Sequence, residues 1–377
     1  MKIVFFISQL GHGGAENVVA NLTSQLAKKG HRIILISHLG NQFYTVSDDV
    51  KLIDVQRWEY NTYEGSLTER IYKKAANRFK DYVHIRRILK EETPDVVISF
   101  LQAWLWQLIM VCTGRYPLIC AERNAMIRPV HKNFLIKQLF YRMAYAVQVM
   151  SRHDKAWLRG RYKRIYPMPN PLRFEPLNKE KYDALFPNRK NILACGRVNT
   201  QKGFDKLIIA FSKIAHDYPE WNVDICGEIE NQAYYQKLLE LVKENDLQGR
   251  IVFLGPRSDV DAVMQSHSIF CLSSQNEGFP NVLSEAMANG LACVSFDIIT
   301  GPSEIINDGL DGIIVEDQNE SALASGLELL ISNEDLRCSL GLHAIENIKR
   351  FEKDRIVNKW ELFFSSIVND YNKSKKS

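Results

Sequence analysis

The nonapeptide EGFPNVLSE, residues 277–285, decides how the rest of the chain is interpreted. The apolar run 269–272 before it predicts a buried strand, and residues 273–278 predict a polar turn. Pro280 is expected to be the first helical residue, because its missing N–H group would have no partner there. We therefore predict a strand, a turn and a helix. Glu277 lies in the turn, and Glu285 lies on the second helical turn at the edge of the apolar face.

The start of this helix is a candidate anion site. The backbone N–H groups between Phe279 and Val282 precede the first intrahelical hydrogen bonds, and the helix dipole favours negative charge beside them. Glu277 and Glu285 border the same space and can accept hydrogen bonds from hydroxyl groups. The stretch predicts a ligand that is both hydroxylated and negatively charged. The alternative is a solvated loop carboxylate and a rim carboxylate on an ordinary helix.

Composition and charge indicate two domains. The chain has 377 residues, of which 46% are apolar and 24% charged, which suits two soluble domains with their own cores. Residues 1–185 carry 29 Lys and Arg against 16 Asp and Glu, whereas the remainder carries 19 against 28. The first domain is therefore expected to present a basic surface.

The cysteines and the apolar segments indicate a cytoplasmic location. The seven cysteines form no CxxC pair, and most lie in apolar runs, which predicts buried thiols in a reducing compartment. No cluster of His or Cys has the spacing of a zinc site, and Asp259-Val260-Asp261 is interpreted as helix capping, so no metal is expected. The amino-terminal run lacks a signal-peptide cleavage region, and the longest apolar stretch is too short to span a bilayer.

Polar and glycine-rich segments follow several predicted strands. Gly11-His12-Gly13-Gly14 follows strand 3–7 and precedes a helix, an arrangement that can hold phosphates. It is not a dinucleotide fingerprint, because Glu16 occupies the position of its last glycine. A plain tight turn is the alternative.

Two further strand ends carry charged groups. Glu122, Arg123 and Asn124 follow strand 118–121, at the edge where α/β proteins place ligands. Gly196, Arg197 and Lys202 follow strand 191–195, and the two cations can donate charge-assisted hydrogen bonds to phosphate oxygens. Solvated loop cations are the alternative for this pair.

The ordered set of motifs resembles the retaining glycosyltransferases of family four. Glu277 to Glu285 is similar to their E-G-x-P-x-x-x-x-E motif. Gly-Gly-Ala-Glu at 13–16, Gly196-Arg197 with Lys202-Gly203, and Gly301-Pro302-Ser303-Glu304 follow the family's order. The resemblance implies an α/β protein of the GT-B fold, with two facing Rossmann-like domains, parallel sheets and an interdomain cleft. The expected boundaries are 1–185 for the acceptor domain, 186–352 for the donor domain, and 353–377 for a helix crossing back to the first.

The resemblance also implies roles for these residues. Glu277 would contact the donor sugar, Glu285 the ribose, and Arg197 with Lys202 the diphosphate, so that Glu277, Arg197 and Lys202 form the catalytic set. The remaining donor-binding candidates are Gly14, Gly196, Gly278, Phe279, Pro280, Asn281 and Val282. Gly13, Glu122, Arg123 and Asn124 are the acceptor candidates, with Arg123 where similar chains often carry His.

The implied activity is retaining transfer of a hexose or N-acetylhexosamine from a UDP-sugar to a lipid-linked or free saccharide, giving an α-glycoside in surface polysaccharide synthesis. No metal cofactor is expected. The basic, aromatic helices predicted at 66–91 and 131–143 favour peripheral binding to an anionic membrane on its cytoplasmic face. Nucleic acid is the rival partner for the basic surface, but no known RNA- or DNA-binding motif is present. A simple solvated basic face is the alternative. A UDP-sugar epimerase and a non-catalytic nucleotide-sugar-binding protein remain the alternatives.

Overall fold

The chain consists of two compact α/β units. The computed structural model describes residues 1–11, 14–38, 44–54, 66–100, 105–123, 134–186 and 190–376. Unit 1 comprises Met1–Pro169 together with Ile356–Ser377, and unit 2 comprises Asn170–Arg355. Among the helices of these ranges, none combines the length and apolar character that a bilayer span requires.

The described residues of unit 1 form a seven-stranded parallel sheet in the order β3-β2-β1-β4-β5-β6-β7. The strands are β1 (Lys2–Gln9), β2 (Arg32–His38), β3 (Val50–Asp54), β4 (Val96–Phe100), β5 (Leu118–Ala121), β6 (Ala146–Val149) and β7 (Ile165–Pro167). The central strands β4, β5 and β6 are buried along their whole length, as their continuous apolar runs predict for a sheet covered on both faces.

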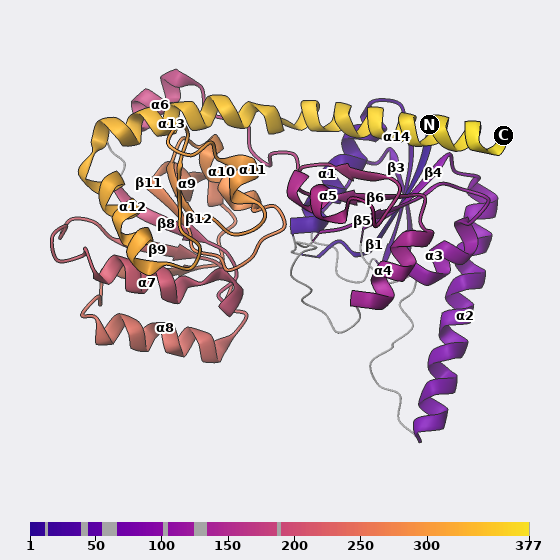
Figure 1. Ribbon diagram of the computed structural model, residues 1–377, viewed down its shortest axis with the longest axis horizontal. Coiled ribbons are helices and arrows are strands. Elements are labelled where there is room, and N and C mark those ends of the chain that lie inside the picture. Colours follow the sequence, from indigo (N-terminus) through magenta and orange to yellow (C-terminus); the bar gives the residue numbers. More distant parts are fainter. Residues whose placement is uncertain are drawn as a thin grey trace. The chain divides into compact units, whose positions relative to one another are not determined.

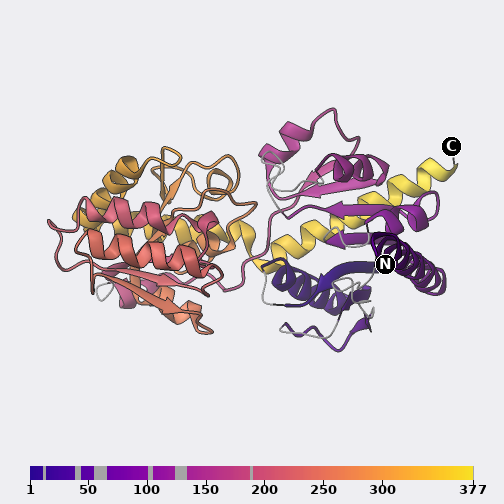
Figure 2. The same ribbon diagram turned by 90° about the horizontal axis from the view of Figure 1, so that it is seen from below.

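Helices connect and cover these strands. They are α1 (Gly14–Lys28), α2 (Leu67–Glu92), α3 (Leu105–Cys112), α4 (Phe134–Met143), α5 (Arg152–Leu158) and α14 (Lys353–Lys376). From Ile356 onward, α14 belongs to unit 1, and the views in Figures 1 and 2 both show it lying along that unit. Its Phe364 meets the ring of Phe5 at 5.9 Å and its Trp360 meets Phe100 at 5.9 Å, so the helix completes the unit 1 core.

Unit 2 repeats the design with a six-stranded parallel sheet among its described residues, in the order β10-β9-β8-β11-β12-β13. The strands are β8 (Lys190–Cys195), β9 (Val223–Cys226), β10 (Ile251–Gly255), β11 (His267–Leu272), β12 (Ala292–Phe296) and β13 (Ile313–Val315). This is the doubly wound Rossmann order, which reverses direction between β8 and β11.

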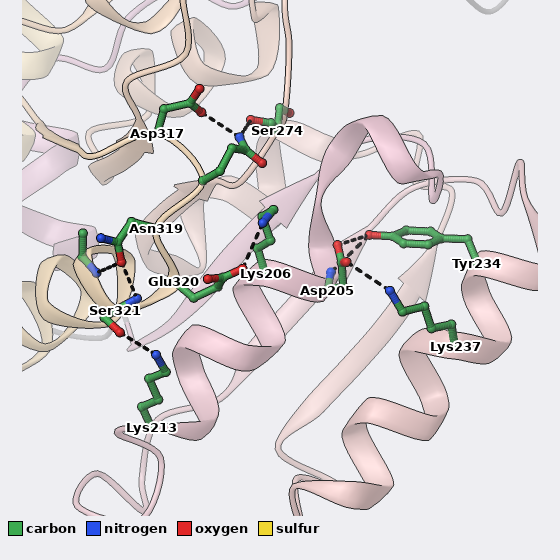
Figure 3. Close-up of polar contacts among 12 residues, drawn as sticks. Asp205, Lys206, Lys213, Tyr234, Lys237, Ser274, Asp317, Asn319, Glu320 and Ser321 are labelled. Carbon is green, nitrogen blue, oxygen red and sulfur yellow. Dashed lines mark hydrogen bonds and ion pairs between the residues drawn. The ribbon is translucent and has the colours of Figure 1, made fainter.

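The helices of unit 2 are α6 (Lys179–Leu185), α7 (Phe204–Ser212), α8 (Gln232–Glu244), α9 (Val260–Gln265), α10 (Asn281–Ala288), α11 (Pro302–Ile305), α12 (Glu320–Ser332) and α13 (Glu334–Ile348). Polar contacts hold α7 between two neighbours (Figure 3). Asp205 on α7 accepts a 2.7 Å hydrogen bond from Tyr234 on α8, and Lys206 pairs with Glu320 on α12 at 2.9 Å. These contacts fix the helix that follows the loop carrying Lys202.

Three sequence predictions need correction. The first unit ends at residue 169 rather than 185, because Tyr182 on α6 is fully buried against Leu177 and Ile345 of unit 2. Residues 179–185 therefore form a helix that packs in unit 2. Pro280 is the residue before the first helical residue of α10, because its ψ of 90° is extended and the helix begins at Asn281. Asp259 stands before α9 without a capping hydrogen bond, because its carboxylate pairs with Arg257 at 2.7 Å instead.

Candidate active site

The reversal point of the unit 2 sheet gathers the predicted donor residues. Gly196 follows β8 directly, and Ser273 to Glu277 follow β11, which pairs with β8. Loops at the carboxyl ends of two such strands diverge and leave room for a ligand. Lys202 and Glu277, which are 75 positions apart in sequence, thus meet at one edge of the sheet.

Lys202 and Glu277 form an ion pair at this edge. The Lys202 Nζ lies 2.7 Å from the Glu277 Oε1, and the two side chains are only 15% and 11% exposed. Ser274 donates a second hydrogen bond, of 2.8 Å, to the same carboxylate oxygen. The backbone of the Lys202 loop is also fixed, since Asn199 accepts a hydrogen bond from the Lys202 N–H and Ser273 donates one to its carbonyl. The ammonium group is therefore held in place before any ligand arrives.

Two glycines allow these segments to approach so closely. A Cβ atom at Gly196 would lie 2.6 Å from the Lys202 Cε, so only glycine leaves space for the lysine stem. Gly301, in the predicted Gly-Pro-Ser-Glu motif, has φ +104°, and a Cβ there would lie 2.7 Å from the Pro280 Cδ. Thr300 beside it donates a hydrogen bond to the Glu277 carbonyl. The motifs after β8, β11 and β12 thus form one packed cluster.

Arg197 has a different environment. Its guanidinium pairs with Glu230 at 2.5 Å, both side chains are largely exposed, and Asn199 donates to the second Glu230 oxygen. The structure therefore brings Lys202 to Glu277 but places the Arg197 charge on Glu230. A diphosphate at Arg197 would compete with this surface partner for the guanidinium.

Glu285 is a buried carboxylate without a donor. It is 8% exposed, and among the described residues none donates a hydrogen bond to its side chain. Burial raises its pKa to about 7, against the opposing charge of Arg173, and Asp261 raises it further. A carboxylate left in this state gains from a hydroxyl ligand, which restores the hydrogen bonds lost on burial.

The backbone between Gly278 and Val282 leads into α10. Leu283 and Ser284 donate to the Pro280 carbonyl, so the N–H groups of Asn281 and Val282 precede the first helical hydrogen bonds. The Phe279 ring is buried and meets Phe351 edge-on at 5.4 Å, so this residue can offer a ligand its backbone but not its ring. The Asn281 side chain accepts a 2.8 Å hydrogen bond from Asn170.

In unit 1, the acceptor candidates Glu122 and Arg123 follow β5. Glu122 is buried, and its carboxylate accepts hydrogen bonds from the Arg123 N–H and from the Tyr141 hydroxyl at 3.1 Å. The Arg123 guanidinium stacks on Phe100 at 4.4 Å, and burial lowers its pKa to about 9, opposed by the charges of Glu122 and Glu16. The Arg123 guanidinium is therefore less available to bind an anionic ligand than the guanidinium of an exposed arginine.

Of the three other predicted site residues in unit 1, one lies within the described ranges. Gly14 is exposed at the first position of α1. Gly13 and Asn124 lie outside the described ranges. Within those ranges, no group of three or more His, Cys, Asp or Glu side chains is arranged to hold a metal ion.

Sequence reasoning missed several residues that complete these clusters. Ser274 and Thr300 bind Glu277, and Tyr141 binds Glu122. Ser274 lies within the predicted turn, which was a usable signal. Tyr141 and Thr300 contact residues 19 and 23 positions away, and no local pattern marks them.

Two doubly wound parallel sheets, one in each unit, are the architecture of the GT-B fold. Solved structures with this fold include a glycosyltransferase from Rickettsia africae, with TM-score 0.77 and 20% identity over 97% of this chain and 98% of that one. Anabaena HepE in complex with UDP and glucose has TM-score 0.77 and 18% identity over 97% of this chain and all of that one.

The chain belongs to glycosyltransferase family 4. The model described as Glycosyltransferase Family 4 matches residues 12–173, and the model described as Glycosyl transferases group 1 matches residues 178–347. The protein is a glycosyltransferase, and the predicted family, enzyme class and α/β GT-B fold are confirmed. The epimerase and the non-catalytic binder are thereby disfavoured.

Two relatives are similar along their whole length. One, from Campylobacter jejuni, is 29% identical over 98% of this chain and 99% of its own, and is named GalNAc-alpha-(1->4)-GalNAc-alpha-(1->3)-diNAcBac-PP-undecaprenol alpha-1,4-N-acetyl-D-galactosaminyltransferase. The other, the amylovoran biosynthesis glycosyltransferase AmsD of Erwinia amylovora, is 28% identical over 95% of this chain and 98% of its own.

Proposed function

We propose that this enzyme transfers a hexose or N-acetylhexosamine from a UDP-sugar to a lipid-linked glycan, with retention, in surface polysaccharide synthesis. The observation that carries the proposal is the partly buried ion pair of Lys202 and Glu277 at the unit 2 sheet reversal. A fixed ammonium there suits a diphosphate, and the neighbouring carboxylates suit sugar hydroxyls.

The acceptor and the linkage are proposed from the relatives. The Campylobacter jejuni relative is named for an undecaprenol-diphosphate acceptor and an alpha-1,4 linkage, and the Erwinia amylovora relative for amylovoran biosynthesis. We extend the lipid-linked acceptor and the α-glycosidic product to this chain on the strength of similarity over nearly the full length of each.

The proposed chemistry requires charge stabilisation at the departing diphosphate. As the glycosidic bond breaks, negative charge develops on the β-phosphate, and the Lys202 ammonium stabilises it. Glu277 orients that ammonium group and accepts a hydrogen bond from a hydroxyl group of the donor sugar. The Glu277 carboxylate is already held by Lys202 and Ser274, which suits the binding of a sugar hydroxyl better than nucleophilic attack, so we favour attack from the face that the phosphate leaves. The departing phosphate then receives the acceptor proton.

Glu285 and the start of α10 complete the proposed donor site. Glu285 would accept hydrogen bonds from the ribose hydroxyls, and the N–H groups of Asn281 and Val282 would face donor oxygens. Arg197 would join the diphosphate by leaving Glu230. Glu122, Arg123, Gly13 and Asn124 remain the acceptor candidates in unit 1, and Gly14 the donor-phosphate candidate there.

We also propose a peripheral location on the cytoplasmic face of an anionic membrane. Helix α2 exposes Ile71, Tyr72 and Phe79, which are 60%, 74% and 64% exposed, on a strongly basic helix. Apolar side chains beside cations are typical of helices that bind anionic lipid surfaces. No metal cofactor and no nucleic-acid partner are part of the proposal.

The test is transfer of labelled sugar from a panel of UDP-sugars to lipid-linked acceptors by wild-type and Lys202→Ala protein. We expect the variant to lose about 10²-fold in kcat/KM, as for one lost transition-state contact. Lys206→Ala is the matched control, because Lys206 forms a similar ion pair with Glu320 on the next helix. Equal activities of the two variants, or an epimerised donor without any new glycoside, would refute the proposal.

A further inference from the structure

Unit 1 contains a cavity at the opposite end of β5 from Glu122 and Arg123. Its volume is about 420 Å³, and it lies at the amino ends of β5 and β6, where Leu118 and Ala146 form part of its wall. Glu122 and Arg123 follow the opposite, carboxyl end of β5. The cavity is therefore separate from the candidate acceptor residues, although Tyr141 lines it and donates its hydroxyl to Glu122.

Three tyrosine hydroxyls in the wall of this cavity are buried and have no partner among the described residues. They belong to Tyr145, Tyr162 and Tyr371. Tyr162 as a whole is only 9% exposed. Burial raises the pKa of Tyr162 and of Tyr371, so both hydroxyls keep their protons at neutral pH and can donate hydrogen bonds. A buried donor without an acceptor is costly, and a ligand that supplies acceptors removes that cost.

The wall is strongly basic. Arg142, Arg161, Lys163 and Arg164 line the cavity, and none of the described lining residues is Asp or Glu. Arg142 and Arg161 lie close enough to the Tyr162 hydroxyl for their charges to oppose the rise in its pKa. None of the four cations forms an ion pair with a described carboxylate; Arg164 instead stacks on Tyr145 at 4.2 Å.

We propose that this cavity is a second ligand site that binds a phosphate-bearing molecule. A phosphate group offers several acceptor oxygens and up to two negative charges, which matches hydroxyl and guanidinium donors on more than one side. The cavity is larger than a phosphate alone, so the remaining volume takes the organic part of the ligand against the rings of Tyr145 and Tyr371, which meet edge-on at 5.1 Å. The ligand is either a soluble phosphate ester or the head group of an anionic lipid.

Calorimetric titration of the full chain with glucose 1-phosphate, with UDP in excess to fill the proposed donor site, tests the soluble source. Sedimentation with vesicles of phosphatidylcholine and phosphatidylglycerol tests the lipid source. The pocket variants are Tyr162→Phe, which removes one unpartnered hydroxyl, and the pair Arg161→Gln with Arg164→Gln. Arg152→Gln with Arg159→Gln is the matched control, because it removes the same charge from the same segment outside the cavity wall.

We expect each pocket variant to weaken binding of one probe about tenfold, as for a lost hydrogen bond to a charged group, and the control pair to change it less than about twofold. If the pocket variants bind only glucose 1-phosphate more weakly, the ligand is a soluble phosphate ester. If they bind only the vesicles more weakly, the ligand is a lipid head group. Failure of the wild type to bind either probe, or equal effects of pocket and control pairs, would overturn the proposal. Tyr162→Phe keeps the test valid if the double variant unfolds, since it disrupts no described hydrogen bond.

Discussion

Replacing Glu285 by Gln removes an ionisable group from a buried position while keeping its shape. In the folded protein, burial raises the pKa of this carboxyl to about 7, whereas the reference value is 4.5. Between pH 4.5 and about pH 7, the folded chain therefore holds a proton on Glu285 that the unfolded chain has released. The stability that this proton provides is fully present below about pH 4.5 and is lost as the pH rises through about 7.

The size of the effect follows from the difference between the two pKa values. About 2.5 pH units correspond to about 3 kcal/mol in the free energy of unfolding. Glu285→Gln should therefore be about 3 kcal/mol more stable than the wild type at pH 8 and nearly equal to it at pH 4.5. Urea unfolding of both proteins across this range measures the difference directly, because contributions of other groups cancel in the comparison.

The same substitution tests the proposed role of Glu285 in donor binding. Wild-type affinity for UDP should fall as the pH drops below about 7, because the protonated carboxyl is a poorer acceptor for the ribose hydroxyls. Glu285→Gln should bind UDP weakly at every pH. Glu328→Gln, at an exposed carboxylate on α12, is the control. A stability difference for Glu285→Gln that is flat between pH 4.5 and 8 would refute the reasoning.

Four further predictions follow from the candidate site and the proposed function. Gly196→Ala should displace Lys202 from Glu277 and lower kcat/KM at least about tenfold. Gly249→Ala should retain activity, because Gly249 also has a positive φ but no neighbour within 4 Å of an added Cβ. Similar losses of activity in both variants would show that backbone strain is responsible. Activity should survive EDTA, and a loss reversed specifically by manganese or magnesium would contradict metal independence. The proton coupling of the new glycoside in NMR should report an α linkage from an α-linked donor, and a β linkage would exclude retention. Ile71→Ser with Phe79→Ser on α2 should weaken sedimentation with anionic vesicles relative to Leu362→Ser on α14, another exposed apolar residue; no difference between them would argue against α2 as the membrane contact.

Much of the fold could be predicted from the sequence because its strands are short apolar runs with polar loops at their carboxyl ends. The predicted strand at 118–121 matches β5 to the residue, and the predicted helix at 66–91 matches α2 to within one residue at each end. Strand β7 and helix α6 are short and carry few apolar residues, so no periodicity marked them. Tyr182, which fixes α6 in unit 2, is buried by contacts with a helix more than 150 residues later.

The candidate site was only partly predictable for a similar reason. The motifs identified Lys202 and Glu277 separately, but their ion pair depends on β8 and β11 becoming neighbours in the sheet. Arg197 and Lys202 looked equivalent in sequence. They differ in the structure because Glu230, 33 residues after Arg197, neutralises one of them at the surface.

The path of the chain through α14 has a consequence for the order of folding during synthesis. Trp360, Phe363, Phe364 and Ile367 are buried in unit 1, although they are synthesised after every residue of unit 2. Unit 2 is continuous in sequence and can complete its core once Arg355 is available, whereas the first 169 residues must wait with Phe5 and Phe100 lacking their aromatic partners. Domains usually fold in the order of synthesis. Here the unit made first is the last to be finished, and its unfilled aromatic core is the surface that a chaperone would need to protect in the interval.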